Sequence, residues 1–60
     1  MALREIFLKI YADIPLILRK EIILILDKEP LTWNVAYVEV FNKTPKSEQI
    51  LKKLREMKII

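Results

Sequence analysis

The chain has 60 residues, which is enough for one domain and close to the lower size limit for independent folding. Hydrophobic residues make up 53% and charged residues 32% of the chain, a composition that excludes intrinsic disorder. Cysteine, histidine and glycine are absent, which excludes disulfide scaffolds, Cys/His zinc sites, Ser-His or Cys-His catalysis and glycine-rich phosphate loops. We expect a single domain over residues 1–60, with no enzymatic activity, cofactor, metal or small-molecule substrate.

No targeting or membrane-spanning segment is predicted. Charged residues follow the N-terminus at once, which is unlike a signal peptide. The most apolar region, residues 14–26, is divided by Arg19-Lys20-Glu21 into runs far shorter than a membrane-spanning helix needs. We therefore expect a cytoplasmic protein without membrane contact. Its abundance of Ile, Leu, Lys and Glu is also typical of heat-adapted proteins.

The first segment predicts an amphipathic helix that ends before Pro15. Apolar residues recur at intervals of three and four, as one face of a helix requires: Leu3, Ile6, Phe7, Ile10, Tyr11 and Ile14. Glu5 and Lys9 form a favourable i,i+4 pair on the other side. Leu8 lies outside the apolar face.

The second segment, residues 15–27, permits two interpretations. Pro15 suits the first turn of a helix, and continuity from there favours one helix of about three turns. The unbroken apolar run Ile22–Leu26 is rich in β-branched residues and ends in a turn-like sequence, which favours a strand. We favour the helix and keep a short strand over residues 21–27 as the alternative.

The third segment predicts a helix that begins after Thr32, a suitable N-cap. One face then carries Trp33, Ala36, Tyr37, Val40 and Phe41. A strand would instead bury the carboxylate of Glu39, which is costly. The spacing of the three aromatic residues suits a partner-binding surface, but such a face more often belongs to the core.

The fourth segment predicts a helix that begins at Thr44-Pro45, a capping residue followed by proline at the first helical position. Its apolar face consists of Ile50, Leu51, Leu54 and Met57. The fold class is therefore mostly α: a small bundle of three to four short helices, in which residues 21–27 are possible as a strand paired across a dimer.

Several apolar residues do not fit inside a monomer of this size, and they predict self-association as a homodimer. The residues that we expect to contribute are Leu8, Leu24, Val35 and Val38. A single strand per chain would also need a strand from a second copy to satisfy its backbone. The main functional prediction is thus a non-enzymatic, self-associating interaction or structural module. Val35 and Val38 could alternatively dock on a different protein.

The basic C-terminal part suggests a small DNA-binding regulator as the alternative function. Residues 42–60 hold six basic and two acidic side chains, a net charge of +4. The candidate nucleic-acid contacts are Lys43, Lys46, Lys52, Lys53 and Arg55. A helix, a short turn and a second basic helix resembles a helix-turn-helix outline. The element order also resembles ribbon–helix–helix proteins, but Ile22–Leu26 lacks the polar residues with which their strand reads bases. Glu48 and Glu56 among the lysines favour an ordinary solvated, ion-paired surface over nucleic-acid binding.

Overall fold

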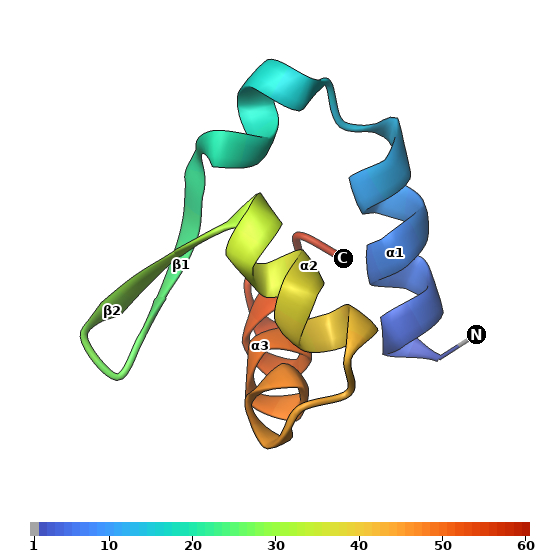
Figure 1. Cartoon of the computed structure of the whole chain (residues 1–60). Helices are drawn as coiled ribbons and strands as arrows, with labels where there is room; N and C mark the ends of the chain where they lie inside the picture. The colour runs from blue at the N-terminus through green and yellow to red at the C-terminus, as the bar shows by residue number, and fades with distance from the viewer. Residues whose placement is uncertain (1) are drawn as a thin grey trace.

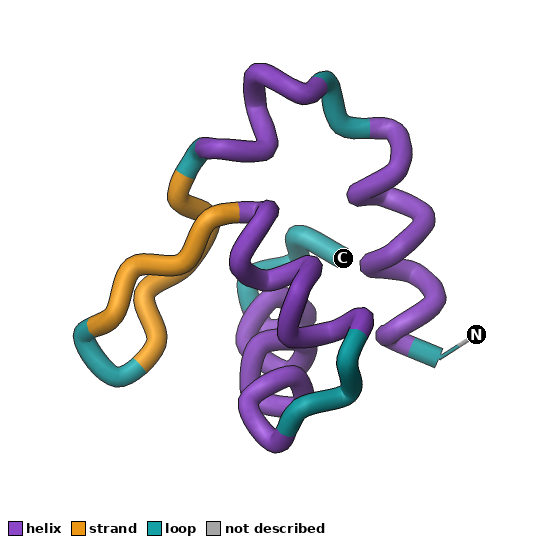
Figure 2. The backbone as a smooth tube through the Cα atoms, in the orientation of Figure 1, coloured by secondary structure: helices purple, strands orange, loops and turns teal. Residues whose placement is uncertain are grey.

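Three α-helices and one β-hairpin enclose a single core in the computed structural model, which describes residues 2–60 (Figure 1). The elements in chain order are α1 (Leu3–Asp13), the 3-10 helix η1 (Leu16–Lys20), β1 (Ile22–Leu26), β2 (Glu29–Thr32), α2 (Trp33–Phe41) and α3 (Pro45–Glu56). The tube in Figure 2 shows the hairpin projecting to one side of the helices, with η1 bridging α1 and β1. The fold is mostly helical, as predicted, but it is not a bundle of helices alone.

Helix α1 confirms the prediction for the first segment. Its last residue is Asp13, and Ile14 is extended at φ −82° and ψ 130°. This conformation is expected because a residue before proline is pushed out of the helical region. Phe7 is the fully buried residue of the helix, and Leu8 packs partly buried against the core.

The expected helix over residues 15–27 is wrong, and the alternative strand is present. Only Leu16–Lys20 are helical, as a 3-10 helix, and Ile22–Leu26 form β1. Its partner is β2 in the same chain, not a second copy, with Leu24 opposite Leu31 and Leu26 opposite Glu29. A strand over Glu29–Thr32 was not predicted. A β-bulge between Ile22 and Leu24 shifts the register at the start of the hairpin.

The hairpin closes through a two-residue turn in a chain without glycine. Asp27 and Lys28 both have positive φ, 51° and 68°. Two successive residues with positive φ match the right-handed twist of paired strands and are typical of a type I′ turn. Aspartate is among the residues that tolerate this conformation, which explains why the chain can turn here.

Helices α2 and α3 confirm the helices predicted for the third and fourth segments. The prediction that Met57 belongs to the apolar face of the last helix is wrong, because Met57 is the C-cap of α3 and is 45% exposed. The backbone N–H of Val35 donates to Thr32 Oγ1 at 3.2 Å, so Thr32 is the N-cap that the sequence predicts. Pro45 begins α3, but the Thr44 side chain makes no cap hydrogen bond. The Thr44 hydroxyl instead donates to Glu39 Oε1 at 3.0 Å, and the hydroxyl of the buried Ser47 donates to the Thr44 carbonyl at 2.6 Å.

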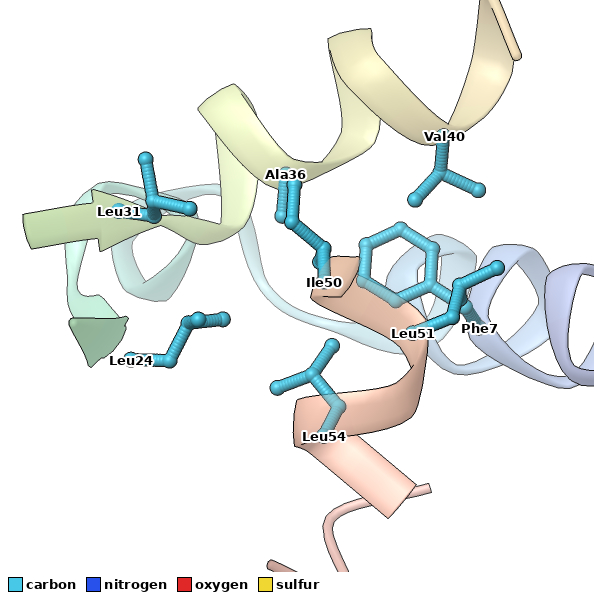
Figure 3. Close-up of a cluster of buried hydrophobic side chains, with 8 residues drawn as sticks. All are labelled: Phe7, Leu24, Leu31, Ala36, Val40, Ile50, Leu51 and Leu54. Carbon is cyan, nitrogen blue, oxygen red and sulfur yellow. The ribbon is translucent and has the colours of Figure 1, made fainter. Parts of the chain in front are cut away.

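The core receives side chains from every helix except η1 and from both strands (Figure 3). Its eight buried hydrophobic residues are Phe7, Leu24, Leu31, Ala36, Val40, Ile50, Leu51 and Leu54. Leu24 and Leu31 are opposite each other in the hairpin and share its inner face. The hairpin therefore completes an interior that the helices alone would leave open on one side.

Arginines close the C-terminal ends of α1 and α2, whose last turns contain no basic residue. Arg19 Nη2 donates to the Tyr11 carbonyl at 3.1 Å, and its guanidinium lies 4.4 Å from the centre of the Tyr11 ring. Arg4 donates to the carbonyls of Val40 and Phe41 at 3.3 Å each. A cation at this end stabilises the helix because the last carbonyls lack partners within it.

All five aromatic residues lie along the seam between α1 and α2. Phe7 contacts Trp33 and Tyr11, with ring centroids 5.8 and 6.2 Å apart. Tyr11 stacks on Tyr37 at 4.3 Å, and Tyr37 stacks on Phe41 at 5.5 Å. Trp33 and Tyr37 pack partly buried against the core, while Phe41 remains 54% exposed. The aromatic face predicted for α2 thus packs mainly within the fold.

Helices α2 and α3 end in the same hydrogen-bonded motif, with lysine at the position that glycine usually occupies. The N–H groups of Lys58 and Ile59 donate to the carbonyls of Arg55 and Leu54, at 3.0 and 2.9 Å. Lys43 and Thr44 repeat this pattern after α2. Both lysines are left-handed, at φ 60° for Lys58 and 53° for Lys43, which costs about 1–2 kcal/mol for a residue with a Cβ.

We predict that Lys58→Gly stabilises the fold, because glycine has no steric penalty at positive φ. The free energy of unfolding should rise by about 1 kcal/mol, measured by urea denaturation with an unchanged m-value. Lys53→Gly, inside α3, is the matched control and should lower it by about 1 kcal/mol. Equal destabilisation by both variants would contradict the left-handed geometry.

We predict that Arg19→Met destabilises the fold by about 1–3 kcal/mol, because it removes charge-assisted hydrogen bonds to α1 and the contact with the Tyr11 ring. Thermal and urea unfolding would measure the loss. Lys20→Met, at the exposed neighbouring position, removes the same charge and should change stability by less than about 0.5 kcal/mol.

Candidate interaction surfaces

The described surface carries nine large hydrophobic side chains that are between 44% and 79% exposed. They are Leu16, Ile17, Leu18, Ile22, Ile25, Val35, Val38, Phe41 and Met57. Five of them fall within ten consecutive residues of η1 and β1. Scattered single hydrophobics are normal on a protein surface, whereas several exposed in one short segment make that segment a candidate interaction surface.

The most exposed of these residues belong to η1. Leu16 and Ile17 are 75% and 79% exposed, and Leu18 is 46% exposed. In this 3-10 helix the only side chain held by hydrogen bonds is that of Arg19, which turns back onto α1. Arg19 thus ties η1 to α1, while Leu16, Ile17 and Leu18 remain exposed.

Strand β1 exposes Ile22 and Ile25 on its outer side, at 60% and 63%. Leu24, which alternates with Ile25, is 4% exposed and lies in the core. Ile22 and Leu24 would lie on the same face of a regular strand, and the bulge between them explains why Ile22 is exposed while Leu24 is buried.

The structure exposes two of the four predicted self-association residues and buries the other two at least partly. Val35 and Val38 are 44% and 54% exposed and lie three residues apart on α2, as expected. Leu24 is buried within its own chain, so its side chain has no surface to offer a partner. Leu8 is partly buried against the core. The sequence analysis missed Leu16, Ile17, Ile22 and Ile25, because a continuous helix over residues 15–27 does not separate inner from outer positions.

The five predicted nucleic-acid contacts do not converge on one face. At 100° per residue, Lys46 and Arg55 lie about 180° apart around the axis of α3. Lys46 Nζ lies 3.4 Å from Glu29 Oε1, and Arg55 donates to the Ile60 carbonyl at 3.0 Å. Lys52 and Lys53 are exposed side by side on the outer part of α3. Lys43 is exposed in the turn before it.

The α2–α3 unit has the connection of a helix-turn-helix, with residues 42–44 between the two helices. The inner face of α3 is buried through Ser47, Ile50, Leu51 and Leu54. Its outer face presents Gln49, Lys52, Lys53 and two glutamates, Glu48 and Glu56. This face is polar and accessible, but its charge is mixed.

An open depression of about 580 Å³ lies at the start of α3, between Arg4, Lys43 and Glu48. Two of its polar side chains, Arg4 and Ser47, already have partners within the chain, because Arg4 donates to α2 and Ser47 donates to the Thr44 carbonyl. Over residues 2–60, no group of three or more acidic side chains is placed to hold a metal ion. In the same range, none of the helices combines the length and apolar composition that a membrane span requires.

Comparisons of this chain with protein-family models, with curated proteins and with solved structures give no match.

Proposed function

We propose that this protein is a small interaction module that associates with itself through its exposed aliphatic side chains. The observation that carries this proposal is the group of five large aliphatic residues between Leu16 and Ile25 that are 46–79% exposed. Burying one such side chain contributes roughly 1.5–3 kcal/mol. The gain is large beside the total stability of about 5–15 kcal/mol of a typical domain.

The exposed aliphatics do not result from a loosely folded chain. The accessible surface is 4373 Å². A compact monomer of 7.2 kDa is expected to expose about 4100 Å². Because the two areas nearly agree, the chain is about as compact as a monomer of its mass, and association would cover the exposed aliphatic side chains.

We predict a solution mass near twice 7.2 kDa, measured by light scattering and by sedimentation equilibrium over a wide range of concentration. A symmetric dimer is the commonest closed assembly. Heteronuclear NMR on dilution should show exchange at residues of η1 and β1. A mass of 7.2 kDa up to the solubility limit would exclude this function.

A second candidate function is binding to duplex nucleic acid through the outer face of α3. Two observations favour it: the three-residue connection between α2 and α3, and the free side chains of Gln49, Lys52 and Lys53 on the exposed face. Lysines in this arrangement would contact phosphates, while Gln49 could reach a base edge. The intervening Glu48 and Glu56 reduce the positive potential, which places this function second.

We predict for this second function that Lys52→Glu with Lys53→Glu abolishes any duplex binding, because affinity depends on phosphate contacts. Lys9→Glu with Lys20→Glu changes the net charge equally but lies on α1 and η1, so it should retain most of the affinity. Fluorescence anisotropy with labelled duplex at low and moderate salt would measure both. Equal loss in the two double variants would indicate a general charge effect and no binding face on α3.

A further inference from the structure

The two outer edges of the hairpin differ in their ability to accept another strand. The sheet in the described residues has only two strands, so β1 and β2 each have one edge without a neighbouring strand. Pro30, in β2, is opposite Ile25, in β1. Since proline has no N–H, it weakens the edge on which it lies.

The turn geometry decides which edge Pro30 affects. In a hairpin closed by two residues, the flanking pair Leu26 and Glu29 exchange hydrogen bonds with each other. The next pair, Ile25 and Pro30, is then the pair without mutual bonds, and its main-chain groups point outward. The outward donor is missing on β2 and present on β1, at the Ile25 N–H.

The edge of β1 carries neither the charge nor the proline that often protects an exposed edge. Its sequence, Ile22–Leu26, contains no charge and no proline, and three of its five residues are β-branched. Ile25 is 63% exposed beside this edge. Only the bulge between Ile22 and Leu24 interrupts it, which leaves the segment from Leu24 to Leu26 free to pair.

We propose that β1 pairs antiparallel with β1 of a second copy, about a two-fold axis at Ile25, and so forms a four-stranded sheet. This inference rests on the proposed self-association and assigns it a surface. The strand suits its own copy because an antiparallel pair is self-complementary: each Ile25 can donate to and accept from the other. The exposed Ile25 side chains of the two copies then lie opposite each other on one face.

The register about Ile25 brings together only uncharged residues. A two-fold axis at Ile25 places Leu24 of one copy opposite Leu26 of the other, twice, so apolar residues lie opposite apolar residues along the paired segment. Glu21 and Lys28 lie outside this segment and do not pair with each other.

The size of the interface predicts its strength. A standard interface buries about 800 Å² on each partner, close to a fifth of the 4373 Å² that this chain exposes. Pairing over the short free segment covers less than that, and we therefore expect a dimer that dissociates on dilution.

The experiment compares solution masses of the full chain and of two variants at Ile25. Ile25→Pro removes the outward N–H at a position where the hairpin needs no donor, and Ile25→Lys places a charge on the edge. Each should raise the dimer dissociation constant at least tenfold, with an unchanged far-UV circular dichroism spectrum. Val38→Lys, at a similarly exposed aliphatic position on α2, is the control and should leave the dimer intact.

Persistence of the dimer in both Ile25 variants, or its loss in Val38→Lys alone, would overturn pairing through β1 while leaving self-association in place. A wild-type chain that stays monomeric at all concentrations would exclude the proposed function as well.

Discussion

The small interior is the constraint on which the rest of the structure depends. One layer of eight apolar side chains, centred on Phe7, Ile50 and Leu54, fills the space between three short helices and a hairpin. A domain of about this length buries only about 60% of the surface that its unfolded chain exposes. Because 53% of the residues are hydrophobic, many remain outside once this core is full. The exposed apolar residues of η1, β1 and α2 follow from this limit.

Arginines and lysines occupy different environments in this structure because their side chains differ in chemistry. All three arginines donate to main-chain carbonyls: Arg4 at the end of α2, Arg19 at the end of α1 and Arg55 at Ile60. A planar guanidinium with several donors can bond to carbonyls and lie on an aromatic ring at once, as Arg19 does on Tyr11. The lysines are left largely at the surface and supply the solubility that a chain with so many exposed aliphatics needs. Part of the +4 net charge of residues 42–60 therefore has a structural role, because Arg55 donates to the Ile60 carbonyl.

The absence of glycine imposes a cost at three places and shapes the protein there. Asp27 and Lys28 turn the hairpin, and Lys43 and Lys58 end helices, all at positive φ. Each of these positions is one that glycine would occupy without strain. The tight turn at Asp27-Lys28 also fixes the register that turns Leu24 inward, Ile25 outward and the prolyl nitrogen of Pro30 away from β1. The same two residues thus decide which edge of the sheet is open.

Local chemistry by itself determined three of the elements. The apolar period of residues 3–14, Thr32 as an N-cap and Thr44-Pro45 as a helix start predict α1, α2 and α3, because these signals act within a few residues. The conformation of residues 15–31 was decided only by the tertiary structure. Ile22–Leu26 are apolar on every side, so periodicity cannot distinguish helix from strand, and the choice depends on β2 and on the inner face of α3. For the same reason Leu24 was expected at an interface but lies in the core, while Ile22 and Ile25 lie outside. Which apolar residues a chain exposes depends on packing between distant segments, and a single sequence does not contain that information in any local pattern.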